Sequence, residues 1–363
     1  MNSNRSDFVQ GLDLSESFYR QIVQPILARR LPQLKYACAL IGAGSEVLGF
    51  DTEMSSDHDW GPRLLLFVES ENLVKNGREI NTVLQQELPV EFRGFPTQYA
   101  LSKPDADGQN FIQHRVDVFS VASFLKDYLG FDYAQTIKSV DWLTFPEQKL
   151  RSITAGRVFR DEVKLHEMRQ QFAYYPDNVW LYLLASGWNR IEQEEHLMGR
   201  AGLVGDEIGS SLIAARLVRD LMRLCFLMEK AYAPYAKWFG TAFTKLSCSK
   251  ELAPVLEQIL QASTWKNREK YLSHAYKFVA AMHNKLKITE TLSEDVAQFH
   301  GRPFWTISMG AFSQAIAAKI TEPEMKKLAQ KRLIGGIDQI SDNTDILEDA
   351  NRRLLFKDFY GLD

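Results

Sequence analysis

The sequence has few cysteines, no long apolar run and no excess of positive charge. The three cysteines, Cys38, Cys225 and Cys248, are widely separated and odd in number, which fits neither a disulfide framework nor zinc-ligand spacing. No run approaches the ~18 apolar residues that a membrane span requires, and the polar N-terminus lacks the apolar centre of a signal peptide. We therefore expect reduced, buried thiols in a cytoplasmic protein with no membrane partner.

The net charge of -3 provides no bulk positive field to attract phosphate backbones, which argues against nucleic acid as a partner. Hydrophobic residues make up 45% of the chain and charged residues 25%, values that are ordinary for a globular protein with a sizeable core. Because 363 residues exceed the usual ~100–200 of a single domain, we predict two domains.

The first predicted domain covers residues 1–145 and mixes helices with strands. Apolar residues at helical spacing indicate an opening helix over 14–31, and a polar, helix-compatible segment covers 72–88. Strand-like runs begin near Tyr36 and Arg63, and further strand-like runs lie around residues 91 and 117.

Strand candidates disappear after Phe145-Pro146, and residues 146–363 are predicted to form helices separated by Gly and Pro signals. Long helices are expected to start at Asp177 and Gly209, and the charged tail EDANRRLLFKDF is expected to be peripheral. The predicted fold class is therefore α+β, with a small mixed β-sheet module followed by a predominantly α-helical domain.

The segment over residues 41–68 suggests a chemical function. Gly44 and Ser45 follow a predicted strand and are expected to form a tight turn. Their small side chains would let backbone N–H groups and a hydroxyl approach a polyphosphate. Asp57 and Asp59 follow after a short loop, and on extended backbone this spacing puts both carboxylates on one side, close enough to share divalent cations. Magnesium ions held there would bridge carboxylate and phosphate oxygens.

Separately, a Gly-Ser pair is more often a plain turn, and an Asp-x-Asp is usually a loop or helix cap. Their order, Gly44-Ser45, Gly49 and then Ser56-Asp57-x-Asp59 before an apolar strand, resembles the G-S-x-x-x-G…S-D-x-D signature of the polymerase-beta-like nucleotidyltransferases, which include antibiotic adenylyltransferases. The strings SDHDWGPR, EFRGFPT and YAPYAKWF also resemble a bacterial family of two-domain proteins with such a module. The resemblance implies binding of ATP or another nucleoside triphosphate at Gly44, Ser45 and Ser56, with two Mg²⁺ ions.

The resemblance also implies a third carboxylate from a later strand. Asp117 lies between two valines on a predicted strand, a position that is hard to explain unless the carboxylate faces solvent or a cation. Glu91 is the rival for this role, and it could instead act as a general base toward the acceptor hydroxyl.

The sequence departs from the common pattern after Asp59, where Trp60-Gly61-Pro62 precede the apolar strand. The proline removes a ladder donor and bends the chain. The departure either shifts the metal geometry or provides Trp60 as a wall on which a base stacks. His58 would point away from the two acids and is interpreted as structural.

The predicted helical domain offers weaker candidates. Tyr235 and Lys237 are suited to stacking a base or contacting a phosphate, and equally to a packing corner. Three arginines could bind phosphate, but a solvated helix face is the favoured interpretation; they are Arg216, Arg219 and Arg223. Three acids near Trp188 suggest a site for a cationic acceptor; they are Glu192, Glu194 and Glu195.

The leading hypothesis is a magnesium-dependent nucleotidyltransferase that moves a nucleoside monophosphate, AMP in the first instance, to a hydroxyl of a small-molecule acceptor and releases pyrophosphate. Asp57, Asp59 and Asp117 would hold the metal. The alternatives are transfer to a protein or a tRNA, and an inactive nucleotide-binding regulatory module.

Overall fold

A computed structural model of the protein describes residues 8–56, 60–100, 112–307 and 309–361. The chain forms two compact units. The first contains residues 1–136 and 149–173, and the second contains residues 137–148 and 174–363. The chain therefore passes between the units three times, whereas the sequence suggested a single passage near residue 145.

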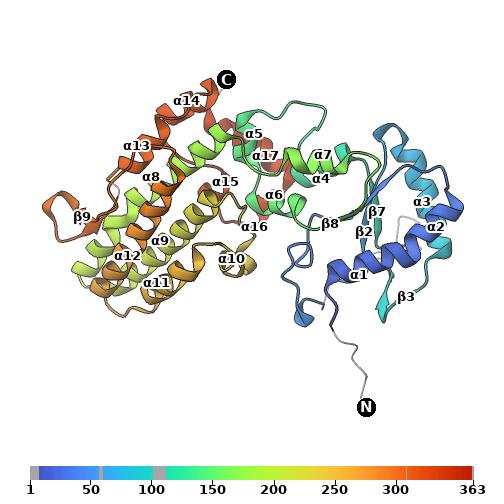
Figure 1. Ribbon diagram of the computed structural model, residues 1–363, viewed down its shortest axis with the longest axis horizontal. Helices are drawn as coiled ribbons and strands as arrows, with labels where there is room; N and C mark the ends of the chain where they lie inside the picture. Colours follow the sequence, from blue (N-terminus) through green and yellow to red (C-terminus); the bar gives the residue numbers. More distant parts are fainter. Residues whose placement is uncertain (1–7, 57–59, 101–111, 308, 362–363) are drawn as a thin grey trace, which may run out of the picture. The chain divides into compact units, whose positions relative to one another are not determined.

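The first unit is built on a four-stranded sheet with the order β7-β2-β1-β8 (Figure 1). Its strands are β1 (Ala37–Leu40), β2 (Leu64–Phe67), β7 (Val116–Phe119) and β8 (Arg157–Arg160). β1 is antiparallel to β2 and β8, and β2 is parallel to β7. Every residue of the two central strands is buried, which explains why both appear in the sequence as continuous apolar runs.

One face of this sheet carries the core of the unit. Cys38, Leu64, Leu66 and Val116 alternate onto this face and join a cluster of buried residues from the adjoining helices. The helices are α1 (Gly11–Phe18), the π-helical turn η1 (Tyr19–Val23), α2 (Gln24–Arg30) and α3 (Leu73–Glu87). They match the helical segments predicted over 14–31 and 72–88.

The opposite face is covered at one end by α4 (Val121–Leu129). Phe124 of this helix packs edge-on against Phe67 and Phe119 of adjacent strands. Ser120 caps the helix by accepting the N–H of Ser123. Asp117 projects on this same face, because it lies two residues before Phe119.

Strand β8 is a finding that the sequence did not predict, since strand candidates were expected to end before residue 146. Its sequence, Arg-Val-Phe-Arg, lacks an apolar run because β8 lies at the edge of the sheet. Its arginines make surface contacts instead. Arg157 forms ion pairs with Asp13 (2.9 Å) and Glu16 (2.6 Å), and the guanidinium of Arg160 lies 4.5 Å from the ring centroid of Tyr36.

Two short hairpins lie outside this sheet. β3 (Glu91–Phe92) pairs with β4 (Phe95–Pro96), and β5 (Gln98–Ala100) pairs with β6 (Ile112–His114). Arg93 and Gly94 both have positive φ angles, as a tight hairpin turn requires. The helices α6 (Glu147–Thr154) and α7 (Leu165–Gln171) flank β8 in the chain.

The second unit is helical, with one short hairpin of β9 (Ala297–Gln298) and β10 (Trp305–Thr306). Its longer helices are α8 (Asp177–Leu203), α9 (Glu207–Met228), α11 (Ser249–Gln261) and α12 (Trp265–Leu286). Its shorter helices are α5 (Ser139–Thr144), α10 (Ala236–Phe243), α13 (Ala311–Ala317), α14 (Pro323–Gln330), α15 (Ile337–Ile340), α16 (Thr344–Glu348) and α17 (Arg353–Lys357). The predicted fold class, α+β with a mainly helical C-terminal part, is confirmed.

The charged tail is largely exposed, as its sequence predicted, but one of its arginines is buried and anchors it. Arg353 is buried and donates hydrogen bonds to Asp141 (2.9 Å) and Thr144 (3.1 Å) of α5. The buried hydroxyl of Tyr360 donates to the carbonyl of Gly335 at 3.0 Å. The charge of Arg353 is buried here because the carboxylate of Asp141 compensates it, which composition alone does not reveal.

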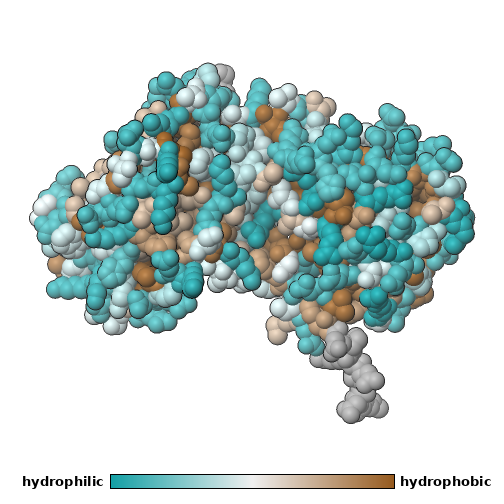
Figure 2. Space-filling model, in the orientation of Figure 1, coloured by the Kyte–Doolittle hydropathy of each residue, from teal (hydrophilic) through white to brown (hydrophobic). Residues whose placement is uncertain are grey.

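Hydrophilic residues predominate on the face shown in Figure 2, with hydrophobic residues in separate areas. None of the helices in the described part of the chain is both long enough and apolar enough to span a membrane.

Candidate functional site

The loop after β1 forms a turn with unused backbone donors. Gly42 (φ 87°) and Gly44 (φ 128°) adopt backbone conformations that favour glycine. The turn is anchored where the N–H of Gly42 donates to the carbonyl of Ser152 (2.9 Å) and the N–H of Phe50 to that of Ser45 (3.0 Å). Within the described chain, the N–H groups of Gly44 and Ser45 have no hydrogen-bond acceptor. Such amides can bind an anion.

An ion pair lies directly against this turn. Arg63, just before β2, donates from Nε to the buried Glu46 carboxylate at 2.7 Å and from Nη2 to the carbonyl of Ala43. A Cβ at Gly44 would overlap both the guanidinium and the carboxylate. The absence of a side chain at Gly44 therefore allows the ion pair to join the turn to the start of β2.

Trp60 does not form a wall for base stacking, and that expectation is wrong. The indole is only 5% exposed, lies edge-on to Phe95 with ring centroids 5.0 Å apart, and stacks on Phe8. Its Nε1 donates to Asp51 at 3.0 Å, and Asp51 also accepts the N–H of Gly11 at 2.7 Å. The Trp60-Gly61-Pro62 departure thus supplies a buried anchor between β1 and β2.

Asp117 lies on the strand next to β2. It is in register with Leu65, two residues after Arg63, and its side chain lies on the face opposite the core cluster. The residue is exposed overall, yet desolvation raises the pKa of its carboxyl, and the positive charges of His114 and Arg63 offset part of the rise.

The other predicted acids have different positions. Asp57 and Asp59 lie outside the described residues, and Ser56 is the last residue of the 3-10 helix η2 (Glu53–Ser56). Glu91 is exposed on the β3–β4 hairpin, which is separate from the four-stranded sheet. Within the described residues, no three or more His, Cys, Asp or Glu side chains are arranged to hold a metal ion.

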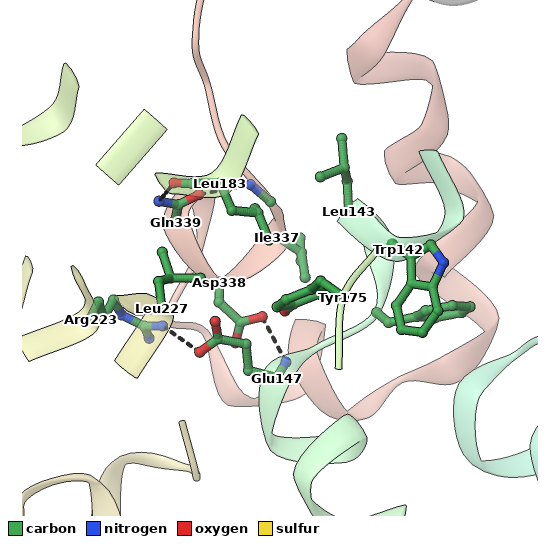
Figure 3. A pocket seen from close by; sticks show the side chains of 12 residues that line it. Trp142, Leu143, Glu147, Tyr175, Leu183, Arg223, Leu227, Ile337, Asp338 and Gln339 are labelled. Atoms are coloured by element: carbon green, nitrogen blue, oxygen red, sulfur yellow. Dashed lines mark hydrogen bonds and ion pairs between the residues drawn. The ribbon is translucent and has the colours of Figure 1, made fainter. Parts of the chain in front are cut away.

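The second unit contains a pocket lined by two carboxylates, one guanidinium and aromatic rings (Figure 3). The backbone N–H of Glu147 donates to Asp338 at 2.9 Å, and the Glu147 carboxylate lies 3.3 Å from Arg223. Tyr175 and Trp142 are among the surrounding side chains. The space left between these groups holds about one water molecule.

Burial changes the ionisation of this acid pair. Desolvation and the neighbouring charge of Asp338 raise the pKa of Glu147 to about 7, while Arg223 opposes the rise. Desolvation also raises the pKa of Asp338. No local pattern points to this pair, because Glu147 and Asp338 are 191 positions apart in the chain.

The remaining candidates of the helical unit are mostly engaged in packing. Tyr235 precedes α10, and the Lys237 ammonium lies 4.9 Å from the ring centroid of Trp238. Nearby, the buried Tyr232 packs against two tyrosines, as a packing corner would. Arg216 pairs with Glu194 (2.5 Å).

Two expectations for the helical unit do not hold, one for Arg223 and one for Trp188. Arg219 pairs with Asp342 at 2.6 Å, but Arg223 lines the pocket and is not on a solvated helix face. The suggested cationic-acceptor site at Trp188 is wrong, because this indole is fully buried and stacks on Phe312 with centroids 4.2 Å apart. Glu195 is buried and accepts the N–H of Ile307 at 2.7 Å, and Glu192 is partly buried.

The chain was compared with known families and solved structures. The sequence model of a family described as a domain of unknown function (DUF4037) matches residues 142–239, which include most of the pocket lining. Five chains of solved structures match, among them a nucleotidyltransferase-like protein from Exiguobacterium sibiricum 255-15. That protein is 12% identical, with 78% of this chain and 82% of that chain covered and a TM-score of 0.29. No protein with a curated description matches.

Proposed function

We propose that the protein is a magnesium-dependent nucleotidyltransferase. It transfers a nucleoside monophosphate, with AMP as the first candidate, from a nucleoside triphosphate to a hydroxyl of a small-molecule acceptor, and it releases pyrophosphate. The acceptor class follows from the resemblance of the Gly44-Ser45 and Asp57-x-Asp59 motif to adenylyltransferases.

One structural observation carries the proposal. The unused N–H groups of Gly44 and Ser45 lie in the turn that Arg63 joins to β2, and Asp117 stands on the strand paired with β2. An anion-binding turn that follows β1 and a carboxylate on β7 are thus supplied by strands of one sheet, with β2 between them. A triphosphate and its counter-ions need both kinds of group.

Magnesium fits the donors that the chain offers. Asp57, Asp59 and Asp117 would hold it through carboxylate oxygens, the ligands that this cation prefers. When bound, the metal neutralises charge on the phosphate oxygens and on the leaving group. Asp117 lies on the open part of the sheet face and is already exposed, so it can meet a cation without moving core residues.

The reaction itself is a single displacement at phosphorus. The acceptor oxygen forms a bond to the α-phosphorus as the bond from that phosphorus to the bridging oxygen breaks, and pyrophosphate leaves with the electron pair. The acceptor hydroxyl loses its proton to a base, a role for which Glu91 remains a prediction. The amides of Gly44 and Ser45 would hold the triphosphate in place.

Replacing Asp59 with Asn should abolish magnesium-dependent transfer. We expect a fall in pyrophosphate release of about 10²-fold or more, because a neutral amide binds the cation that neutralises phosphate charge much more weakly than a carboxylate does. The assay follows pyrophosphate release from labelled ATP in the presence of a cell-extract fraction of small molecules. Asp132→Asn, at an exposed loop position, is the matched control and should retain activity. Normal turnover of Asp59→Asn would contradict the assignment.

A further inference from the structure

The Trp60-Gly61-Pro62 departure has a second effect, which is to place an arginine at the glycine turn. Trp60 is fixed by Asp51, and its carbonyl accepts a hydrogen bond from Arg115 at 2.7 Å. Gly61 has a φ of 137°, and the chain then enters β2 at Leu64 with Arg63 directed back to the turn. The extra residues therefore determine where the Arg63 guanidinium lies.

The guanidinium is oriented but not fully used. Glu46 accepts from Nε and the Ala43 carbonyl accepts from Nη2, which leaves further N–H groups of this side chain available. The Arg63 side chain is 21% exposed, whereas its Glu46 partner is only 3% exposed. A buried carboxylate thus holds an arginine whose side chain is itself partly exposed.

These donors share a location with the unused amides. The guanidinium touches the position where Gly44 would carry a Cβ, and the N–H groups of Gly44 and Ser45 belong to the same turn. A planar guanidinium next to free amides suits an oxygen-rich polyanion, since arginine can donate two parallel hydrogen bonds to a phosphate.

We propose that Arg63 is a triphosphate-binding residue, which donates to a non-bridging phosphate oxygen of a nucleotide bound at the Gly44–Ser45 turn. This inference rests on the proposed function and extends it by assigning a ligand-contacting role to the departure from the family pattern. Glu46 acts through Arg63 as a positioning residue. A purely structural Arg63 would only tie the turn to β2.

The two roles predict opposite effects for a change at Glu46. Glu46→Gln removes a negative charge beside the turn but keeps the guanidinium. If Arg63 binds phosphate, this variant should bind a polyanion as well as or more tightly than the wild type, whereas Arg63→Gln should bind it about tenfold or more weakly. If Arg63 only ties the turn to β2, both variants lose the same ion pair and should weaken binding to a similar extent.

The experiment is calorimetric titration of the full chain with inorganic tripolyphosphate and magnesium. Arg63→Lys, which keeps the charge but loses the planar fork, should give an intermediate affinity. Arg20→Gln is the control, because Arg20 also pairs with a glutamate but lies on the exposed side of α1 and η1. Thermal unfolding of each variant verifies folding, and the Glu46→Gln and Arg63→Lys results decide the question if Arg63→Gln does not fold.

The outcomes separate this inference from the proposed function. Equal weakening in Glu46→Gln and Arg63→Gln, or unchanged binding in Arg63→Gln, overturns the role of Arg63 while leaving nucleotide transfer by the wild type untouched. A wild type that binds tripolyphosphate in an Arg63-dependent way but transfers no nucleotide supports the anion site and contradicts the enzyme assignment. A wild type that binds neither tripolyphosphate nor nucleotide overturns both.

Discussion

At the scale of single residues, the environment decides between roles that residue type leaves open. Trp60 was a candidate for stacking a base, and the same indole is buried and hydrogen-bonded to Asp51. Trp188, a candidate for an acceptor site, is a core residue. Aromatic side chains suit both roles because they combine a large apolar area with one polar handle. Nothing in the local sequence distinguishes a buried indole from an exposed one.

Trp60→Phe should destabilise the first unit without removing its aromatic contacts. Phenylalanine cannot donate to Asp51, whose carboxylate would stay buried with one donor fewer. We expect a loss of about 1–3 kcal/mol in the free energy of unfolding, measured by urea denaturation. Trp305→Phe, at a position 42% exposed, is the control and should change stability by less than about 0.5 kcal/mol. Equal effects in the two variants would contradict the anchoring role of Trp60.

We expect Glu147 to make the stability of the fold depend on pH between about 4.5 and 7. Its pKa is raised from 4.5 to about 7 in the folded state, so the folded protein binds more protons than the unfolded chain between these values. The free energy of unfolding should therefore decrease as pH rises through this window, by about 3 kcal/mol at most. The raised pKa of Asp338 acts in the same direction.

Glu147→Gln is the variant that tests this pH dependence. It removes the titrating group and keeps the shape of the side chain, so its stability should vary less with pH between about 4.5 and 7 than that of the wild type. Denaturant unfolding at a series of pH values measures the difference. Identical pH profiles for wild type and variant would show that Glu147 ionises normally in the fold.

At the scale of elements, periodicity was informative where one face or both faces of an element are buried. The continuous apolar runs predicted β1 and β2, and helical spacing predicted α1 and α2, whereas α3 was expected only from a polar, helix-compatible segment. β8 was missed because an edge strand with charged ends carries neither signal. In the same way, the buried contact of Arg353 was not predicted, because its partner Asp141 is distant in sequence.

Two helix glycines should respond oppositely to alanine. Gly202 of α8 faces Trp265 at the start of α12, and a Cβ there would overlap the indole, so Gly202→Ala should destabilise the second unit by about 1–3 kcal/mol. Gly240 of α10 has open space around its Cβ position, and Gly240→Ala should stabilise by about 0.5–1 kcal/mol through helix propensity. Thermal unfolding of both variants compares the signs, and a stabilising Gly202→Ala would contradict the close packing.

At the scale of the whole molecule, the sequence predicted the fold class and the existence of a glycine turn, but not how distant segments support that turn. The N–H of Gly42 donates to the carbonyl of Ser152. Ser152 lies in the segment 149–173, which belongs to the first unit although it follows residues 137–148 of the second. Arg63 and Glu46 are only 17 positions apart, yet their ion pair depends on the bend that the Trp60-Gly61-Pro62 departure creates. Contacts of this kind follow from chain topology, which local patterns do not encode.

The central claim is that the first unit binds a nucleoside triphosphate with magnesium, and its most direct test is calorimetric titration of ATP, GTP, CTP and UTP with magnesium. The titrations use the wild type and the double variant Asp57→Ala/Asp59→Ala. We predict that at least one nucleotide binds to the wild type and that the double variant loses the magnesium-dependent part of this binding. Absence of binding by all four nucleotides, or equal magnesium-dependent binding by the double variant, would contradict the account.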